Sequence, residues 1–198
     1  MNTIFVIGED ALSCEIGKRL VVDVMQWEIS QCPIDCGGVT KLRKALPRYL
    51  NLARQYPILC VADTDRKCPK ELLKAWFPES PPTNFILRLA VTESESWVLA
   101  DSRAFATFLN ISTTHIPASP DEITDPKRTV VNLARKSRHR QIRYEMVSSR
   151  DPEKPGSGYN QHLCTFVRDY WQPLIAAEHS PSLARAVHQL SAFSKGQQ

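Results

Sequence analysis

The chain has 198 residues, 42% of them hydrophobic, and a formal net charge of +4. This size allows one substantial hydrophobic core, and the mild positive charge permits anionic partners without requiring them. No apolar run approaches the roughly 20 residues that cross a bilayer, and the first residues lack the basic region and cleavage site of a signal peptide, so we expect a cytoplasmic protein with no membrane partner. The six cysteines are scattered along the chain, which favours reduced thiols over a disulfide framework.

An acidic pair, Glu9 and Asp10, follows the first predicted strand (residues 3–7) and precedes a predicted helix over 11–25. One interpretation makes such acids favourable charges at the N-terminus of the helix, and we adopt it for Asp10. For Glu9 we favour a ligand role, because open α/β sheets place their ligands at the carboxyl ends of parallel strands.

Two glycines separate a short predicted strand (28–31) from a predicted helix over 39–54. Gly37 and Gly38 would let a phosphate approach the backbone, which gives a nucleotide-binding hypothesis, but the rest of a P-loop or dinucleotide fingerprint is missing and a loop is the better interpretation. Cys32 and Cys36 resemble half a zinc site. No second Cys or His pair follows at zinc-finger spacing, so zinc is not predicted.

The strongest candidate site follows the apolar segment 58–62, which we predict to be a buried strand. Two carboxylates, Asp63 and Asp65, come next with one residue between them. Side chains at i and i+2 of an extended chain project to the same side, so the two would converge on one cation if the extended conformation continues. Carboxylate oxygens suit Mg²⁺ or Mn²⁺. The alternative is a turn in which the aspartates cap a helix beginning near Pro69.

A third acidic group, Glu93 and Glu95, follows the next predicted strand, residues 85–91. We take Glu95 as the better candidate for a metal ligand or base, and Glu93 as the weaker one. The alternative places both in the first turn of a helix over 94–108 that carries Trp97. Trp97 either packs beside the metal site or anchors its helix under the sheet, and we favour the second.

The alternation of strand and helix over the first part of the chain predicts a parallel α/β sheet flanked by helices. We place this domain at residues 1–111. Residues 112–198 are predicted to form a mostly helical extension packed on it, with a Pro- and Ser-rich connection at its start, a linker at 148–158, and a last helix capped by Ser180 with Pro181 at its first position. A further helix is predicted over 159–177, and we assign its apolar stripe to the core: Leu163, Phe166, Val167, Tyr170, Trp171 and Leu174.

The strongest basic run of the chain extends from Lys127 to Arg143 and contains no acid. Charge runs are often solvated faces, but this one would also contact a phosphate backbone in a sequence-independent, salt-sensitive manner. We take Arg135, Arg138 and Arg140 as candidates for nucleic-acid binding.

Taken together, these acids resemble the metal site of the Toprim fold of topoisomerases, primases and overcoming-lysogenization-defect nucleases. The whole chain is also similar to a bacterial Toprim-related family of unknown function that is often encoded beside ATPases. The similarity rests on five segments: Asp63-Thr64-Asp65-Arg66-Lys67-Cys68-Pro69, Glu93 to Asp101, Asp125-Pro126-Lys127, Gly158-Tyr159-Asn160 and Ser180-Pro181-Ser182-Leu183. The chain departs from the common Toprim pattern at the first acid, where Gly8 precedes Glu9 and Asp10 follows it.

The resemblance implies a Toprim-like (Rossmann-like) sheet in which Glu9, Asp63 and Asp65 hold Mg²⁺ or Mn²⁺, with Glu95 as an additional catalytic acid. Lys127 would offset charge on a transferring phosphate. The leading hypothesis is therefore a divalent-metal-dependent nuclease that hydrolyses DNA or RNA, including tRNA, in a bacterial defence or mobile-element system.

The rival hypothesis is a catalytically silent Toprim-like regulatory or interaction module. Its partner would be an ATPase of the ABC or overcoming-lysogenization-defect type, and exposed aromatic side chains such as Trp171 would form the partner surface.

Overall fold

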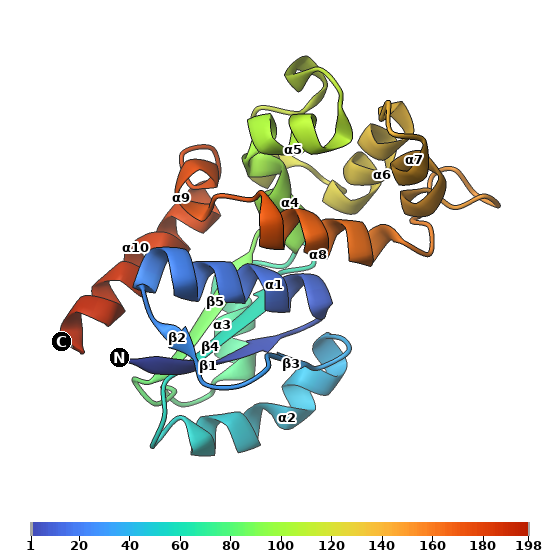
Figure 1. The fold of residues 1–198 in the computed structure, drawn as a ribbon. Coiled ribbons are helices and arrows are strands. Elements are labelled where there is room, and N and C mark those ends of the chain that lie inside the picture. The colour runs from blue at the N-terminus through green and yellow to red at the C-terminus, as the bar shows by residue number, and fades with distance from the viewer. Residues whose placement is uncertain (1, 198) are drawn as a thin grey trace.

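A five-stranded parallel β-sheet forms the centre of the fold in the computed structural model, which describes residues 2–197 (Figure 1). The strand order is β2-β1-β4-β5, and β3 also pairs with β1. Every pair is parallel. The strands are β1 (Thr3–Gly8), β2 (Glu28–Ile29), β3 (Ile34–Asp35), β4 (Ile58–Asp63) and β5 (Phe85–Ala90). The predicted parallel α/β sheet flanked by helices is thus confirmed.

The central strand β4 is apolar on both sides because helices cover both faces of the sheet. Leu59 and Val61 face the core that contains α1 (Ala11–Arg19), whereas Ile58, Cys60 and Ala62 face the core formed with α2 (Val39–Leu52) and α3 (Pro69–Trp76). Figure 1 shows α1 above the sheet and α2 below it. This double burial explains why the strand is a continuous hydrophobic run rather than an alternating one.

The remaining helices are α4 (Ser94–Ala100), α5 (Ser102–Leu109), α6 (Pro126–Lys136), α7 (Arg140–Met146), α8 (Tyr159–Asp169), α9 (Pro173–Ala176) and α10 (Pro181–Gly196), with short 3-10 turns at Thr113–His115 and Pro120–Glu122. Among them, α5, α6 and α7 form a lobe at the upper right of Figure 1, α8 lies across α1, and α10 packs against β5 next to α9.

The helices after residue 111 share one hydrophobic core with the sheet. Trp97, Leu163 and Trp171 belong to the same buried cluster as Ile4 and Val6 of β1. The indole Nε1 of Trp97 donates to Ser182 Oγ at 2.7 Å, and that of Trp171 donates to the Trp97 carbonyl at 3.0 Å. Trp97 therefore anchors its helix by packing and hydrogen bonding inside the core.

Several predicted elements differ from the structure at their ends or interiors. The helix expected over 11–25 changes into a π-helix at Leu20–Met25, and the helix expected over 94–108 is interrupted at Asp101, whose carboxylate caps α5 by accepting from Ala104 N at 3.2 Å. The apolar stripe of 159–177 is buried only in part, since Tyr170 is 53% exposed and lies beyond the end of α8. The expected caps of the last helix, Ser180 and Pro181, are confirmed.

All six cysteines are free thiols in the described part of the chain. Among residues 2–197, no helix is both long and apolar enough to span a membrane.

Candidate functional site

Three adjacent strands, β1, β4 and β5, bring acidic side chains to one edge of the sheet. Gly8 pairs with Val61, and Asp63 pairs with Ala90, so the carboxyl ends of these strands are in register. The backbone N–H of Asp63 donates to Glu9 Oε2 at 3.2 Å. The first acid predicted from the sequence thus lies directly beside the second.

Asp63 is held by the loop that follows β5. Its Oδ1 accepts hydrogen bonds from Ser94 N at 2.9 Å and from Ser94 Oγ at 2.6 Å. Burial nevertheless raises the pKa of Asp63 well above its ordinary value, and the negative charges of Glu95, Glu9 and Asp10 raise it further. The ionised form of Asp63 therefore destabilises the folded protein.

Glu95 is buried, with 4% of its surface exposed, and is contacted by two groups from the C-terminal helices. Tyr159 OH donates to Glu95 Oε1 at 3.0 Å, and Lys127 Nζ lies 3.8 Å from the same oxygen. Burial raises the pKa of Glu95, although Lys127 works against this shift. Burial alone would lower the pKa of Lys127, but the nearby carboxylates outweigh it, so that pKa is raised.

We call Glu9, Asp63 and Glu95 the acidic cluster. Burial, together with the charges of Asp65 and Asp10, also raises the pKa of Glu9, against the hydrogen bond from Asp63 N. Each member is therefore a carboxylate whose charge the folded protein disfavours. Such shifts are common where titratable groups are gathered for chemistry or ion binding, although structural networks also produce them.

Three further acids, Asp65, Asp10 and Glu93, lie near this edge of the sheet but do not belong to the acidic cluster. Asp65 is exposed and sits in a left-handed turn with φ 48°, followed by Arg66 at φ 65°, so the extended conformation does not continue to Asp65. The alternative of a turn after Asp63 is thus confirmed, but its second part is wrong, because the N-cap position of the helix near Pro69 is Cys68 and no aspartate caps it. Asp10 accepts from Ser13 N at 2.8 Å as the N-cap of α1, as expected. Glu93 Oε2 accepts from Lys127 N at 3.0 Å, which satisfies the start of α6.

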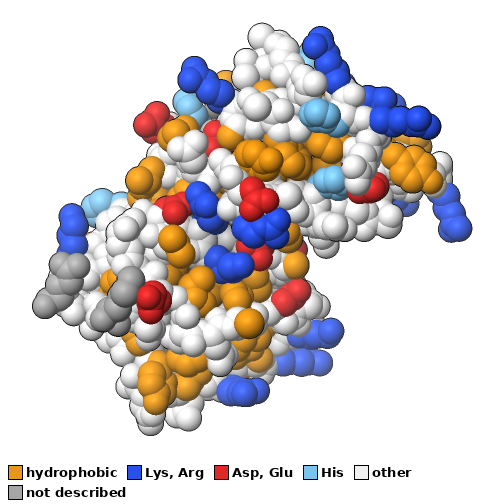
Figure 2. Space-filling view, in the orientation of Figure 1, with side chains coloured by type: hydrophobic (Ala, Val, Ile, Leu, Met, Phe, Trp, Pro, Cys, Tyr) orange, Lys and Arg blue, Asp and Glu red, His pale blue; other side chains and the backbone are white. Residues whose placement is uncertain are grey.

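The basic run leads away from the acidic cluster along α6 and α7. Lys127 stands at the start of α6, and Arg135 lies eight residues further on the same helix, about 12 Å along its axis. Arg135, Arg138 and Arg140 are exposed and form no salt bridge within the described residues. Figure 2 shows Lys and Arg side chains gathered around the helical lobe in the upper right of the view. Arg143 instead donates to the Ser137 carbonyl.

Gly37 and Gly38 offer no free backbone amide for a phosphate. Both have positive φ angles, 67° and 114°. The Gly37 N–H donates to Asp35 Oδ1 at 2.7 Å, and the Gly38 N–H donates to the Glu9 carbonyl at 2.8 Å. These glycines shape the turn between β3 and α2 and place it against Glu9.

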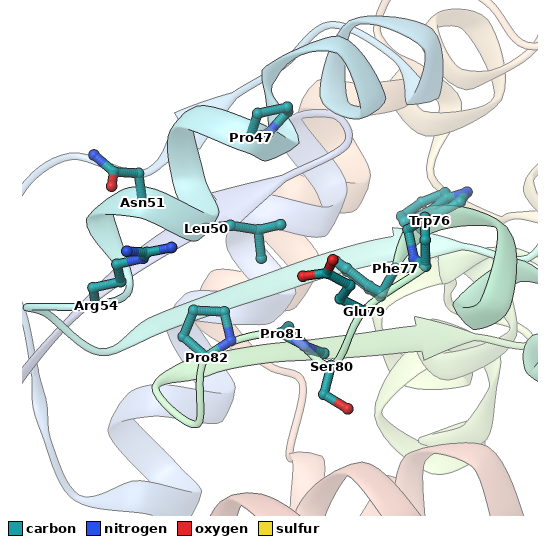
Figure 3. Close-up of a pocket in the computed structure, with 11 residues that line it drawn as sticks. Pro47, Leu50, Asn51, Arg54, Trp76, Phe77, Glu79, Ser80, Pro81 and Pro82 are labelled. Carbon is teal, nitrogen blue, oxygen red and sulfur yellow. The ribbon is translucent and has the colours of Figure 1, made fainter.

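A cavity of about 540 Å³ lies away from the acidic cluster, between α2 and the proline-rich loop after α3 (Figure 3). Leu50, Trp76 and Pro82 line it from three segments, with Arg54 and Glu79 at its polar side. None of the predicted site residues takes part in this cavity.

The carboxylate oxygens of the acidic cluster are of the chemical type that binds divalent cations. Carboxylate oxygens are the ligands that Mg²⁺ and Mn²⁺ prefer, and bringing several into one buried place raises the pKa of each. Within residues 2–197, however, no group of three His, Cys, Asp or Glu side chains is arranged so that it could hold a metal ion. Asp63 Oδ1 is engaged by Ser94, and Glu95 Oε1 by Tyr159 and Lys127, so a shared ion would require these carboxylates to rotate.

Two residues that contact the cluster were not singled out by the sequence as part of it. Ser94 stands between the predicted candidates Glu93 and Glu95, and its backbone and hydroxyl both bind Asp63. Tyr159 reaches Glu95 across a separation of 64 positions. The sequence signals for them were the Glu-Ser-Glu motif and the Gly-Tyr-Asn motif before α8.

Comparisons of the chain with protein-family models, with curated proteins and with solved structures gave no match. The Toprim relationship therefore remains an expectation from the sequence motifs, and what stands on the structure is a parallel α/β sheet with an acidic cluster at the carboxyl ends of its strands.

Proposed function

We propose that the protein is a divalent-metal-dependent nuclease of Toprim type that hydrolyses phosphodiester bonds in DNA or RNA. The observation that carries this proposal is the convergence of Glu9, Asp63 and Glu95 beside one cation, Lys127, at the edge of a parallel sheet. The exposed basic side chains that lead away from this edge support a polyanionic substrate.

In this proposal Glu9 and Asp63 would hold Mg²⁺ or Mn²⁺, joined by Asp65 once its turn rearranges, and the ion would supply Lewis acidity and lower the pKa of water. Glu95 accepts the proton of the attacking water, because its raised pKa suits it to exchange protons nearer neutrality than an ordinary carboxyl. Lys127 places positive charge beside the phosphate as negative charge develops there. Tyr159 keeps Glu95 in place through its 3.0 Å hydrogen bond.

The first test is titration calorimetry of Mg²⁺ and Mn²⁺ with the wild type and the Asp63→Ala variant, since it requires no assumption about the substrate. We expect binding to the wild type that the variant loses. The matched control is Glu28→Ala, which removes an exposed acid on β2 beside Thr3, at the opposite end of β1 from Glu9. Cleavage of DNA and tRNA should then depend on Asp63 and Asp65, and normal metal-dependent cleavage by the double alanine variant would refute the assignment.

The rival assignment is a catalytically silent module of an ATPase complex. Trp171 does not form a partner surface, because its side chain is fully buried with 0% exposure, as its place in the apolar stripe of 159–177 predicted. Failure of both cations to bind, together with co-purification with an ATPase, would favour this assignment over the nuclease.

A further inference from the structure

A second pocket, which the sequence did not indicate, lies in the helical lobe between α5, α7 and α8. It encloses about 530 Å³, and we call it the aromatic pocket after Phe108, His162 and Tyr170, which line it together with His139 and Arg140. Figure 2 shows apolar side chains with histidines at their border in this region, in the upper half of the view. Its volume lies within the range of about 300–1,000 Å³ that is typical of small-ligand sites.

The aromatic rings of the pocket are packed against each other and against the core. Phe108 lies 5.7 Å from Tyr170 and 6.5 Å from His162 between ring centroids, and Tyr170 stacks on the buried Phe166 at 6.5 Å with an interplanar angle of 12°. Tyr170 remains 53% exposed. A ring that is fixed on one side and open on the other offers a preorganised stacking surface at little entropic cost.

The charges around the pocket favour an anionic ligand. Arg140 and His139 line it, and the exposed Arg138 stands next to them in sequence. Glu145, the acid that contacts the lining residue His162, is already engaged, since it lies 2.7 Å from His162 Nε2 and accepts from Gln141 Nε2 at 3.0 Å. Flat rings bordered by uncompensated cations match the two parts of a nucleotide, its base and its phosphate.

We infer that the aromatic pocket binds a base of single-stranded nucleic acid, by stacking on Tyr170 and Phe108, while Arg138 and Arg140 contact the adjoining phosphates. The strand must be single because both faces of a base inside a duplex are covered by its neighbours. This inference rests on the proposed function for its biological use, and it narrows the substrate class of that function to single strands.

Helix α8 connects the pocket with the acidic cluster. Tyr159 at its start binds Glu95, and Tyr170 follows its last turn on the same face as His162 and Phe166. Eleven residues of helix span about 16 Å. A strand with one base in the pocket would therefore carry a phosphate to the cluster a few nucleotides away.

The test is binding of fluorescently labelled oligo-dT and oligo-U, followed by anisotropy in EDTA so that no metal takes part. The Tyr170→Ala variant loses the ring on which one base stacks, so it should bind roughly 5- to 150-fold more weakly than the wild type. Tyr170→Phe should retain wild-type affinity. Arg140→Gln should make the negative slope of the logarithm of the association constant against the logarithm of the salt concentration shallower by about 0.7. The control is Tyr144→Ala, an equally aromatic residue of α7 that is 80% exposed and outside the pocket.

Unchanged affinity of Tyr170→Ala, equal loss in Tyr144→Ala, tighter binding of a hairpin duplex, or no binding of either oligonucleotide would each overturn the inference. Because binding is measured without metal, its failure is separate from failure of the proposed nuclease. If binding depends on Tyr170 but no Mg²⁺-dependent cleavage is seen, the inference about the pocket stands and the proposed nuclease function is wrong. If cleavage occurs but neither binding nor cleavage depends on Tyr170, the nuclease function stands and the inference about the pocket is wrong.

Discussion

Replacing Asp63 by Asn should make the folded protein more stable at neutral pH, even though the residue lies at the centre of the proposed site. The fold raises the pKa of Asp63 well above its ordinary value of 3.8, mainly through burial and against the two hydrogen bonds from Ser94. The native state therefore binds the Asp63 proton more tightly than the unfolded chain does. Asn is neutral at every pH and keeps an oxygen that can accept from Ser94.

The sign and size of the effect follow from proton linkage. Below pH 3.8 the carboxyl is protonated in both states and costs nothing, and as pH rises toward the higher native pKa the ionised group progressively destabilises the fold. Each unit of pKa difference is worth about 1.4 kcal/mol. For a chain of 198 residues, 1 kcal/mol shifts Tm by about 2–4 °C. Each unit by which the fold raises the pKa thus corresponds to a gain of about 3–5 °C in the variant.

The assay is thermal unfolding followed by circular dichroism between pH 4 and pH 8, without divalent cations. We expect the Tm advantage of Asp63→Asn to be largest at pH 8 and to shrink steadily toward pH 4. Glu28→Gln, which neutralises an exposed acid on β2, should stay within about 0.5 kcal/mol of the wild type at every pH. A lower Tm for Asp63→Asn at pH 8, or an advantage that does not depend on pH, would show that the cluster does not destabilise the fold as argued.

Three further substitutions test how the site is supported. Tyr159→Phe should lower the free energy of unfolding by about 1–3 kcal/mol in urea titrations, because Glu95 then loses its buried donor; no loss would mean that water replaces the hydroxyl. Gly8→Ala should cost about 1–3 kcal/mol, since a Cβ there would lie 2.5 Å from Cys14 N, and a Tm equal to the wild type would contradict that clash. Trp171→Ala should cost about 3–5 kcal/mol by leaving a cavity in the core, and a loss below about 1 kcal/mol would contradict the burial of this side chain.

The sheet could be predicted from the sequence because its signal is local. Residues 58–62 and 85–91 are short apolar runs bounded by turn residues, and β4 and β5 begin within one residue of these predictions. The two-residue strand β3 was missed because its length shows no alternation. The π-helix at Leu20–Met25 was missed because its apolar residues also fit an ordinary helix.

The site could be predicted only as far as strand ends determine it. Parallel strands placed Glu9 beside Asp63, but the position of Asp65 depends on a turn that the sequence offered only as the alternative to a continued strand. The partners of Glu95 come from helices that are distant in sequence, and their approach depends on how the lobe packs. The same holds for Tyr170, which helical spacing assigned to the core although α8 ends before it.

The hydrogen bonds from the C-terminal helices also bear on the order in which the protein acquires its parts during translation. All five strands are complete once residue 90 has been made, but Glu95 receives its contacts from Lys127 and Tyr159, and Trp97 binds Ser182. A nascent chain that has not yet reached Tyr159 has synthesised the acids without the groups that orient Glu95, and one that has not yet reached Ser182 still lacks the hydrogen-bond acceptor of Trp97. The sheet is thus available early during synthesis, whereas the finished acidic cluster belongs to the nearly completed polypeptide.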